Sequence, residues 1–125
     1  MLSINIVCVG KLKEEYLKSA INEYSKRLSK YCSLNFIELQ DEKLPNKLND
    51  SLIDEIKQKE AAKIINHIKK DSYIICLDLK GKERSSEDFS KKIDDIALNF
   101  NSSITFVIGG TLGLTDDVLN LANEK

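Results

Sequence analysis

The part of this sequence best suited to chemistry is a glycine-rich stretch that follows an apolar run. In ITFVIGGTLGLTDD, residues 104–117, an apolar run typical of a strand stops at Gly109-Gly110, and a third glycine follows at Gly113. The glycine loop has no lysine to hold a phosphate and no acid to hold a metal. It suits a ligand that needs close backbone approach, such as an adenosine moiety. The alternative is that the glycines serve only tight turning and helix packing.

Several common glycine motifs do not fit this stretch. A Walker loop requires Gly-Lys-Ser/Thr, which is not found here. The dinucleotide fingerprint opens the first strand–helix unit with a different spacing, whereas here Gly-Gly-x-x-Gly follows the fourth predicted strand. A phospho-receiver domain needs acids at the end of its first strand, and the first strand here ends in Val9-Gly10-Lys11.

Basic residues cluster in two of the loops that follow predicted strands. They are Lys11, Lys13, Lys80, Lys82 and Arg84. If these loops share one edge of a sheet, a protein of net charge −1, with 19 basic and 20 acidic residues, still presents a basic rim to phosphates. The alternative is that these side chains are ordinary solvated loop charges.

The remaining polar residues give weaker signals. His67, the only histidine, flanks the apolar stripe of a helix and is expected to be structural. Asp78 ends a buried strand and is expected either to orient a ligand hydroxyl or to cap the next turn. No residues have metal-ligand spacing or form a Ser/His/Asp set, so we predict no metal site and identify no catalytic residue.

Length and composition favour one cytoplasmic domain spanning residues 1–125. The apolar runs are shorter than the roughly 20 residues that a membrane span needs, and the N-terminus does not resemble an export signal. Three widely spaced cysteines, Cys8, Cys32 and Cys76, are expected to be reduced and packed as small apolar side chains.

The elements that must position these loops alternate along the chain. Apolar runs predict strands at residues 4–9, 33–39, 73–79 and 104–108. Helical spacing predicts helices between them, around residues 17–28, 53–68 and 85–100, and a last one that starts at Thr115 and runs to the end of the chain. This order predicts an α/β fold of Rossmann-like type, with a mostly parallel sheet flanked by helices. Ligands of such sheets bind beyond the carboxyl ends of the strands.

Four segments together resemble one known family, the ribosomal RNA large subunit methyltransferase H family, which is of the SPOUT (α/β-knot) class. They are VGKLKEEYLKSAINEYSKRLSKY at residues 9–31, DEK at 41–43, LDLKGKERSSEDFS at 77–90 and FVIGGTLGL at 106–114. The resemblance covers essentially the whole chain in the family's order and spacing. No single segment is decisive, but their combination is highly specific.

The resemblance implies an enzyme that uses S-adenosylmethionine to methylate N-3 of a pseudouridine in 23S ribosomal RNA. It also implies a cytoplasmic homodimer that acts on the ribosome. Leu77 and Gly109 match cofactor-contacting positions of the family, and Gly110 and Gly113 belong to the same loop by adjacency. The glycines then allow an uncharged nucleoside and its sulfonium to lie against backbone.

The family is also known to continue past the position that matches Lys125. Its C-terminal segment forms the knot, a third cofactor loop and much of the dimer interface, and we expect this chain to be the domain without that segment. An alternative function is therefore a non-enzymatic α/β module that binds a nucleoside or the ribosome.

Overall fold

The computed structural model describes residues 2–10, 15–40, 47, 49–68, 71–77, 84–99, 102–109 and 113–124. Strands and helices alternate strictly along the described chain, as the apolar pattern predicts. The elements are β1 (Leu2–Val9), α1 (Glu15–Leu28), β2 (Cys32–Leu39), α2 (Asp50–His67), β3 (Tyr73–Leu77), α3 (Ser86–Asn99), β4 (Ser103–Ile108) and α4 (Asp116–Leu121).

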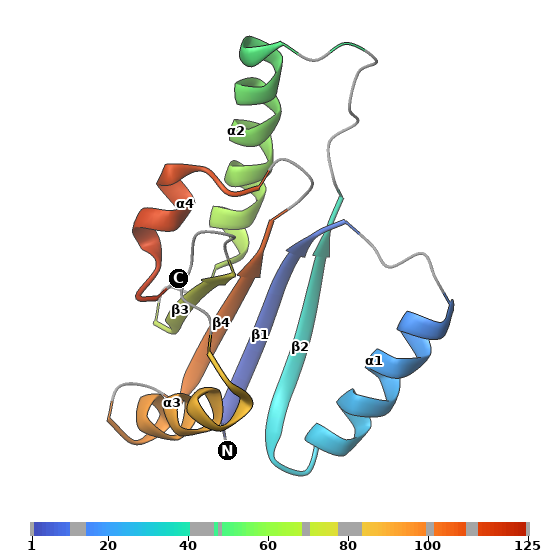
Figure 1. Cartoon of the computed structure of the whole chain (residues 1–125), viewed down its shortest axis with the longest axis vertical. Helices are drawn as coiled ribbons and strands as arrows, with labels where there is room; N and C mark the ends of the chain where they lie inside the picture. Colours follow the sequence, from blue (N-terminus) through green and yellow to red (C-terminus); the bar gives the residue numbers. More distant parts are fainter. Residues whose placement is uncertain are drawn as a thin grey trace.

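The four strands form one parallel sheet in the order β2-β1-β4-β3 (Figure 1). β1 and β4 are the two inner strands, and Ile4 of β1 is in register with Leu34 of β2 and Ile104 of β4. The predicted α/β class with a parallel sheet and flanking helices is confirmed. Since all strands run in one direction, their carboxyl ends lie on one edge.

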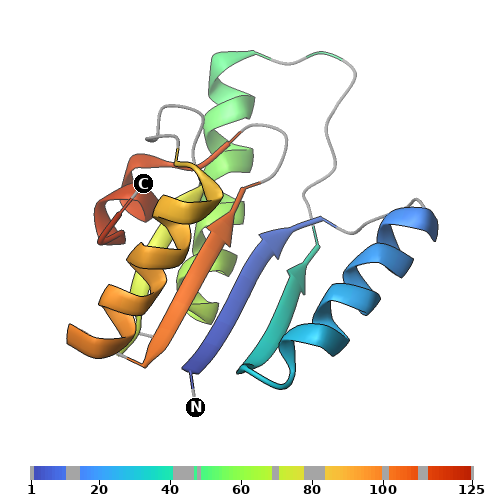
Figure 2. The ribbon, with the colours of Figure 1, turned by 60° about the horizontal axis from the view of Figure 1, so that its bottom comes forward.

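One face of the sheet is covered by α2 and α4. Val7 of β1 and Val107 of β4 are fully buried there against Ile64 of α2 and Val118 of α4. Figure 2 shows α2 behind the strands, with α3 on the opposite side. This larger core fixes the central strands and therefore the positions of the loops that follow them.

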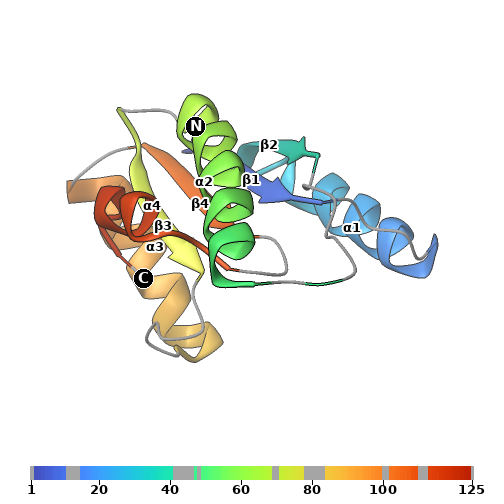
Figure 3. The ribbon, with the colours of Figure 1, turned by 90° about the horizontal axis from the view of Figure 1, so that it is seen from above.

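The other face is covered in part by α3. Ile75, Ile104 and Phe106 form a second core with Ile96 of α3. Phe89 of α3 meets Phe106 edge to face, with ring centroids 5.9 Å apart, a favoured aromatic geometry. Viewed from above, α1 stands apart from the other three helices, beyond the β2 side of the sheet (Figure 3). The face between α1 and α3 is therefore less covered.

Polar side chains cap the N-termini of three helices. The amide of Leu52 donates to Asn49 Oδ1 at α2 (2.8 Å) and the amide of Asp88 donates to Ser85 Oγ at α3 (3.1 Å). At α4 the amide of Val118 donates to the Thr115 hydroxyl (3.4 Å). Such bonds satisfy amides that have no partner inside the helix. The helix starts predicted near residues 85 and 115 are thus confirmed.

The expectation that the last helix runs to the end of the chain is wrong. α4 ends at Leu121, because Ala122 is extended (φ −74°, ψ 139°). Glu124 then lies parallel to β3 and forms a bridge with Ile75. Without this segment the outer edge of β3 would present unpaired backbone groups, and pairing with them outweighs continuation of the helix.

Candidate functional site

The carboxyl ends of three strands bring apolar side chains together at one edge of the sheet. Leu77, the last residue of β3, is in register with Ile108 of β4, and Ile108 is in register with Cys8 of β1. Leu77 is 52% exposed and Ile108 is 38% exposed, although most of their strand neighbours are buried. Two exposed aliphatic side chains at the ligand-binding edge of a parallel sheet form a ledge on which an apolar ring can pack.

Gly109 directly follows this ledge, and packing explains why it is a glycine. A Cβ atom at Gly109 would lie 2.9 Å from Leu114 Cδ2 and 3.1 Å from the carbonyl carbon of Gly113. Gly113 itself has φ +84°, in the left-handed region that side chains disfavour. Of the two roles in the alternative left open by the sequence, packing therefore operates at Gly109 and turning at Gly113. Gly110 lies outside the described residues.

The basic residues predicted to form a rim are only partly described. Lys11, Lys13, Lys80 and Lys82 lie outside the described residues, as do Asp78 and the DEK of residues 41–43. Arg84 is described, and its guanidinium is turned toward the protein. Its Nε donates to Glu124 Oε1 (2.7 Å), and its Nη2 forms an ion pair with the same oxygen at 2.6 Å.

A cleft opens between α1 and the less covered face of the sheet. Its volume is about 660 Å³, within the range of small-molecule sites. Phe36 and Ile108 contribute apolar surface, whereas Lys18, Asn22 and Glu38 add polar groups. The cleft reaches the carboxyl edge, since Ile108 belongs both to its wall and to the apolar ledge.

Cys8 lines this cleft and is the most accessible of the three free thiols, because Cys32 and Cys76 are buried. Burial raises the pKa of the Cys8 thiol, and the nearby negative charge of Glu38 raises it further. A thiol with a raised pKa is protonated at neutral pH and is a poor nucleophile. All three cysteines are free; Cys32 and Cys76 are packed in the interior as expected, whereas Cys8 is only partly buried.

Three further expectations concern His67, metal ions and membrane-spanning helices. Nδ1 of His67, at the end of α2, lies 2.8 Å from the Lys63 carbonyl oxygen, an exposed contact within the same helix. Within the described ranges, no three His, Cys, Asp or Glu side chains stand close enough together to hold a metal ion. None of the helices in that part of the chain has the length and apolar character needed to cross a membrane.

Sequence reasoning missed three parts of this edge. Ile108 carries a usable signal, since it precedes the glycines and is in the same apolar run. The α1 cleft has no local signal, because it depends on how far a helix stands from the sheet. Glu124 also has none, because its partner Arg84 is 40 residues away.

Comparison with known proteins identifies the class to which this fold and edge belong. A family model described as "Predicted SPOUT methyltransferase" matches residues 2–125. The chain belongs to this SPOUT methyltransferase family, and the resemblance found in the sequence is confirmed.

Individual relatives are more specific. The chain is 58% identical over 124 residues to the "Ribosomal RNA large subunit methyltransferase H" of Clostridium acetobutylicum, covering 99% of this chain and 78% of that protein. It is 56% identical over 126 residues to the proteins of the same name from Clostridium novyi and Clostridium botulinum (strain Kyoto), with the same coverage.

Proposed function

We propose that this chain is part of an S-adenosylmethionine-dependent methyltransferase that modifies N-3 of a pseudouridine in 23S RNA of the large ribosomal subunit. The observation that carries the proposal is the match of 99% of the chain to relatives named ribosomal RNA large subunit methyltransferase H. The geometry of the carboxyl edge supports it, because Leu77 and Gly109, the two positions tied to the cofactor by resemblance, lie on neighbouring strand ends.

The residues present fit an adenosyl group. Leu77 and Ile108 expose aliphatic surface suited to the face of a purine ring. Gly109 directly follows this surface and, as a glycine, leaves its amide and carbonyl groups uncovered by a side chain of its own. Because Leu114 fills the space beside Gly109, we propose that Gly109 acts through its backbone, with Gly110 and Gly113 shaping the same loop.

The chemistry asks little of charged side chains. S-adenosylmethionine supplies a methyl group on a sulfonium, and the protein must hold the acceptor nitrogen in line with that methyl. Positioning of this kind supplies much of the rate acceleration of a two-reactant reaction. N-3 of the base must also lose its proton, and we assign no residue of this chain to that step.

The RNA partner is proposed to meet the basic loops. Lys11 and Lys13 follow β1, and Lys80 and Lys82 follow β3, so both pairs belong to connections that leave the carboxyl edge. Phosphate contacts position an RNA and make its binding sensitive to salt. A ribosomal substrate also implies a cytoplasmic enzyme.

A homodimer is proposed from the resemblance and is supported by the surface of α1. Four exposed residues spaced four apart form an apolar stripe along this outlying helix. They are Tyr16, Ala20, Tyr24 and Leu28. Stripes of this kind on soluble proteins commonly mark interaction surfaces.

A methylation assay tests the proposed function. The protein encoded by the complete reading frame is incubated with S-adenosylmethionine carrying a labelled methyl group and with ribosomes from cells that lack the modification. We expect label at one pseudouridine of 23S RNA and none in small-subunit RNA. Cofactor binding without any incorporation would favour the non-enzymatic binding module, and absence of both would contradict the proposal.

A further inference from the structure

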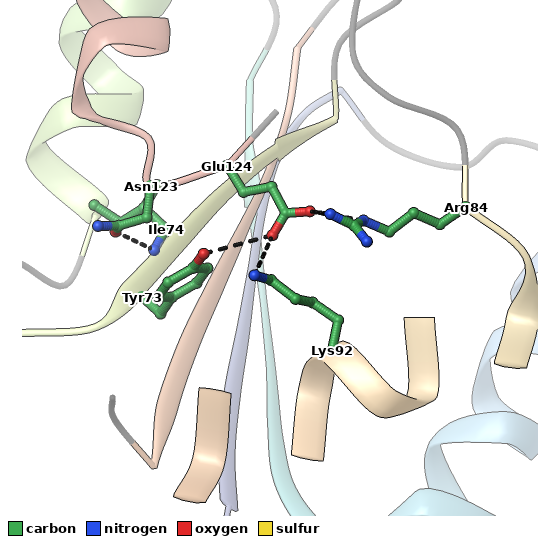
Figure 4. A network of polar contacts seen from close by, with 6 residues as sticks. All are labelled: Tyr73, Ile74, Arg84, Lys92, Asn123 and Glu124. Carbon is green, nitrogen blue, oxygen red and sulfur yellow. Dashed lines mark hydrogen bonds and ion pairs between the residues drawn. The ribbon is translucent and has the colours of Figure 1, made fainter. Parts of the chain in front are cut away.

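A network of polar contacts surrounds Glu124 on the outer side of β3 (Figure 4). Arg84 donates from Nε to Oε1 of its carboxylate (2.7 Å), and Arg84 Nη2 forms an ion pair with the same oxygen at 2.6 Å. Lys92 Nζ lies 3.6 Å from Oε2, and the Tyr73 hydroxyl donates to Oε2 at 3.5 Å. Lys92 also lies 5.7 Å from the centroid of the Tyr73 ring. One carboxylate thus gathers side chains from β3, from α3 and from the residue two before α3.

This carboxylate is shielded from solvent. The Glu124 side chain is 15% exposed and that of Arg84 is 28% exposed. The Arg27–Glu23 pair on α1 has side chains that are 70% and 57% exposed, with a single 3.2 Å contact. Shielded, charge-assisted bonds with two donors are stronger and more directional than solvated surface pairs. The Arg84–Glu124 contact is therefore suited to fix geometry.

The backbone beside this carboxylate is joined to the end of β3. The amide of Cys76 donates to the Glu124 carbonyl oxygen (2.9 Å), and the amides of Asn123 and Glu124 donate to the Ile74 carbonyl oxygen (2.8 and 3.2 Å). Asn123 Oδ1 also accepts from the amide of Ile74 (2.9 Å). Cys76 immediately precedes Leu77. The contacts that hold Glu124 in place therefore also restrain Cys76, the residue before Leu77 of the apolar ledge.

We propose that Arg84 and Glu124 are positioning residues for the cofactor ledge. Their ion pair holds residues 123–124 against β3, and the Cys76–Glu124 backbone bond passes this restraint on to Leu77. Neither side chain needs to touch the cofactor. The inference rests on the proposed function, since it assigns to the pair a role in S-adenosylmethionine affinity, and it gives Arg84 a task inside the protein rather than on an RNA phosphate.

The test compares variants of the Arg84–Glu124 pair with variants of the exposed pair on α1. R84M, E124Q and the double variant R84M/E124Q remove the charges while keeping much of the side-chain volume. R27M/E23Q does the same for the control pair. A charge reversal is avoided, because an arginine at position 124 would face Lys92. For each variant of the complete protein, S-adenosylmethionine affinity is measured by calorimetry well below the unfolding temperature, together with the exchange rate of the Cys76 amide by NMR.

We expect R84M and E124Q each to weaken S-adenosylmethionine binding by about fivefold or more, a usual size for coupling between sites. The affinity of the double variant for S-adenosylmethionine should be no lower than that of the single variant with the lower affinity, because the two residues act as one unit. In the methylation assay, the KM for the cofactor should rise while kcat stays nearly unchanged. R84K keeps the charge but not the two-donor geometry, and we expect an intermediate loss. The control R27M/E23Q should match wild type.

Two outcomes overturn the inference in distinguishable ways. If Cys76 exchange accelerates while affinity in R84M and E124Q stays within twofold of wild type, the pair only secures the edge of the sheet. If the wild-type protein itself binds no S-adenosylmethionine, the proposed function is wrong and this inference is wrong as well.

Discussion

Leu114 occupies the space that a side chain at Gly109 would need. An added Cβ would lie 2.9 Å from Leu114 Cδ2, closer than real Cβ contacts come, and 3.0 Å from Leu114 Cγ, tighter than most of them. Leu114 is buried in the larger core with Val118 and Val107. Packing against Leu114 therefore requires a glycine at position 109.

Substitution of Gly109 should consequently lower the free energy of unfolding. We expect G109A to cost about 1–3 kcal/mol, typical of overpacking, and L114A to cost about 2–5 kcal/mol, typical of a lost core leucine. Because L114A makes room for the added methyl group, the double variant should lose less than the sum of the two. Urea unfolding of the four proteins measures this, and strictly additive losses would contradict the packing explanation.

Leu77 offers a cleaner test of the apolar ledge, because its side chain is half exposed. We expect L77D to weaken S-adenosylmethionine binding by about tenfold or more, which corresponds to about 1.4 kcal/mol, since a carboxylate replaces apolar surface where the adenosyl group would pack. L98D is the matched control, because Leu98 on α3 is 84% exposed and belongs to neither described core. Equal affinity of L77D and L98D would remove Leu77 from the cofactor site.

Cys8 should titrate at a higher pH than a free thiol. Burial, and secondarily the charge of Glu38, raise its pKa, so alkylation of the native protein should reach half its maximal rate above the ordinary thiol value of about 8.5. E38Q should lower this midpoint only in part, because burial is the larger cause. Buried Cys32 and Cys76 should react later. A midpoint at the free-thiol value would show that Cys8 is solvated.

The same raised pKa has a consequence for stability. The folded protein holds the Cys8 proton to higher pH than the unfolded chain does, so the unfolded chain binds fewer protons between the two pKa values. The free energy of unfolding should therefore fall as pH rises above the ordinary thiol pKa and through the folded one. C8A should show a smaller fall over this range than wild type when both are unfolded with urea at several pH values.

Neutralising the basic loops should change the salt dependence of ribosome binding. If Lys11 and Lys13 contact phosphates, K11Q/K13Q should flatten the log–log salt slope by about one to two units, with S-adenosylmethionine affinity unchanged. K26Q/K30Q is the control, because Lys26 is in the last turn of α1 and Lys30 just precedes β2, at the opposite edge of the sheet. Equal slopes for the two variants would return Lys11 and Lys13 to ordinary solvated loop charges.

The stripe on α1 predicts how the protein associates. Y24E places a charge among Tyr16, Ala20 and Leu28 and should shift the proposed homodimer toward monomer in sedimentation equilibrium. K18E, on the side of α1 that lines the cleft, is the control and should leave the association constant unchanged. A wild-type protein that sediments as a monomer at all concentrations would contradict the dimer.

Most of the fold was predictable because its signals are local. Strand residues such as Val7 and Val107 belong to continuous apolar runs, as expected of strands covered on both faces, and hydroxyl caps such as Thr115 mark helix starts. The end of α4 was not predictable in this way. Nothing in the polar residues after Leu121 indicates a strand, and only the open edge of β3, contributed by residues some 50 positions earlier, makes them extended.

The site was predictable to the extent that topology determines it. Parallel strands place the residues after Leu77 and Ile108 on one edge whatever the strand order, and this followed once the β-α alternation was recognised. The proximity of Leu77 and Gly109 did not follow from it, because it also requires β3 to lie beside β4. Pairing of Arg84 with Glu124 did not follow. A charged residue in a loop has the same local sequence whether it faces solvent, a phosphate or a carboxylate brought close by tertiary packing.

The position of β4 between β1 and β3 affects how the chain folds during its synthesis. Ile4 and Ile104 pair directly although they are separated by nearly the whole chain, and contacts this distant in sequence slow folding. During synthesis β1 can pair with β2 early, but its inner edge stays open until residue 108 has left the ribosome. Open strand edges invite pairing with other chains. The nascent protein thus exposes its central strand to misassociation until β4 arrives.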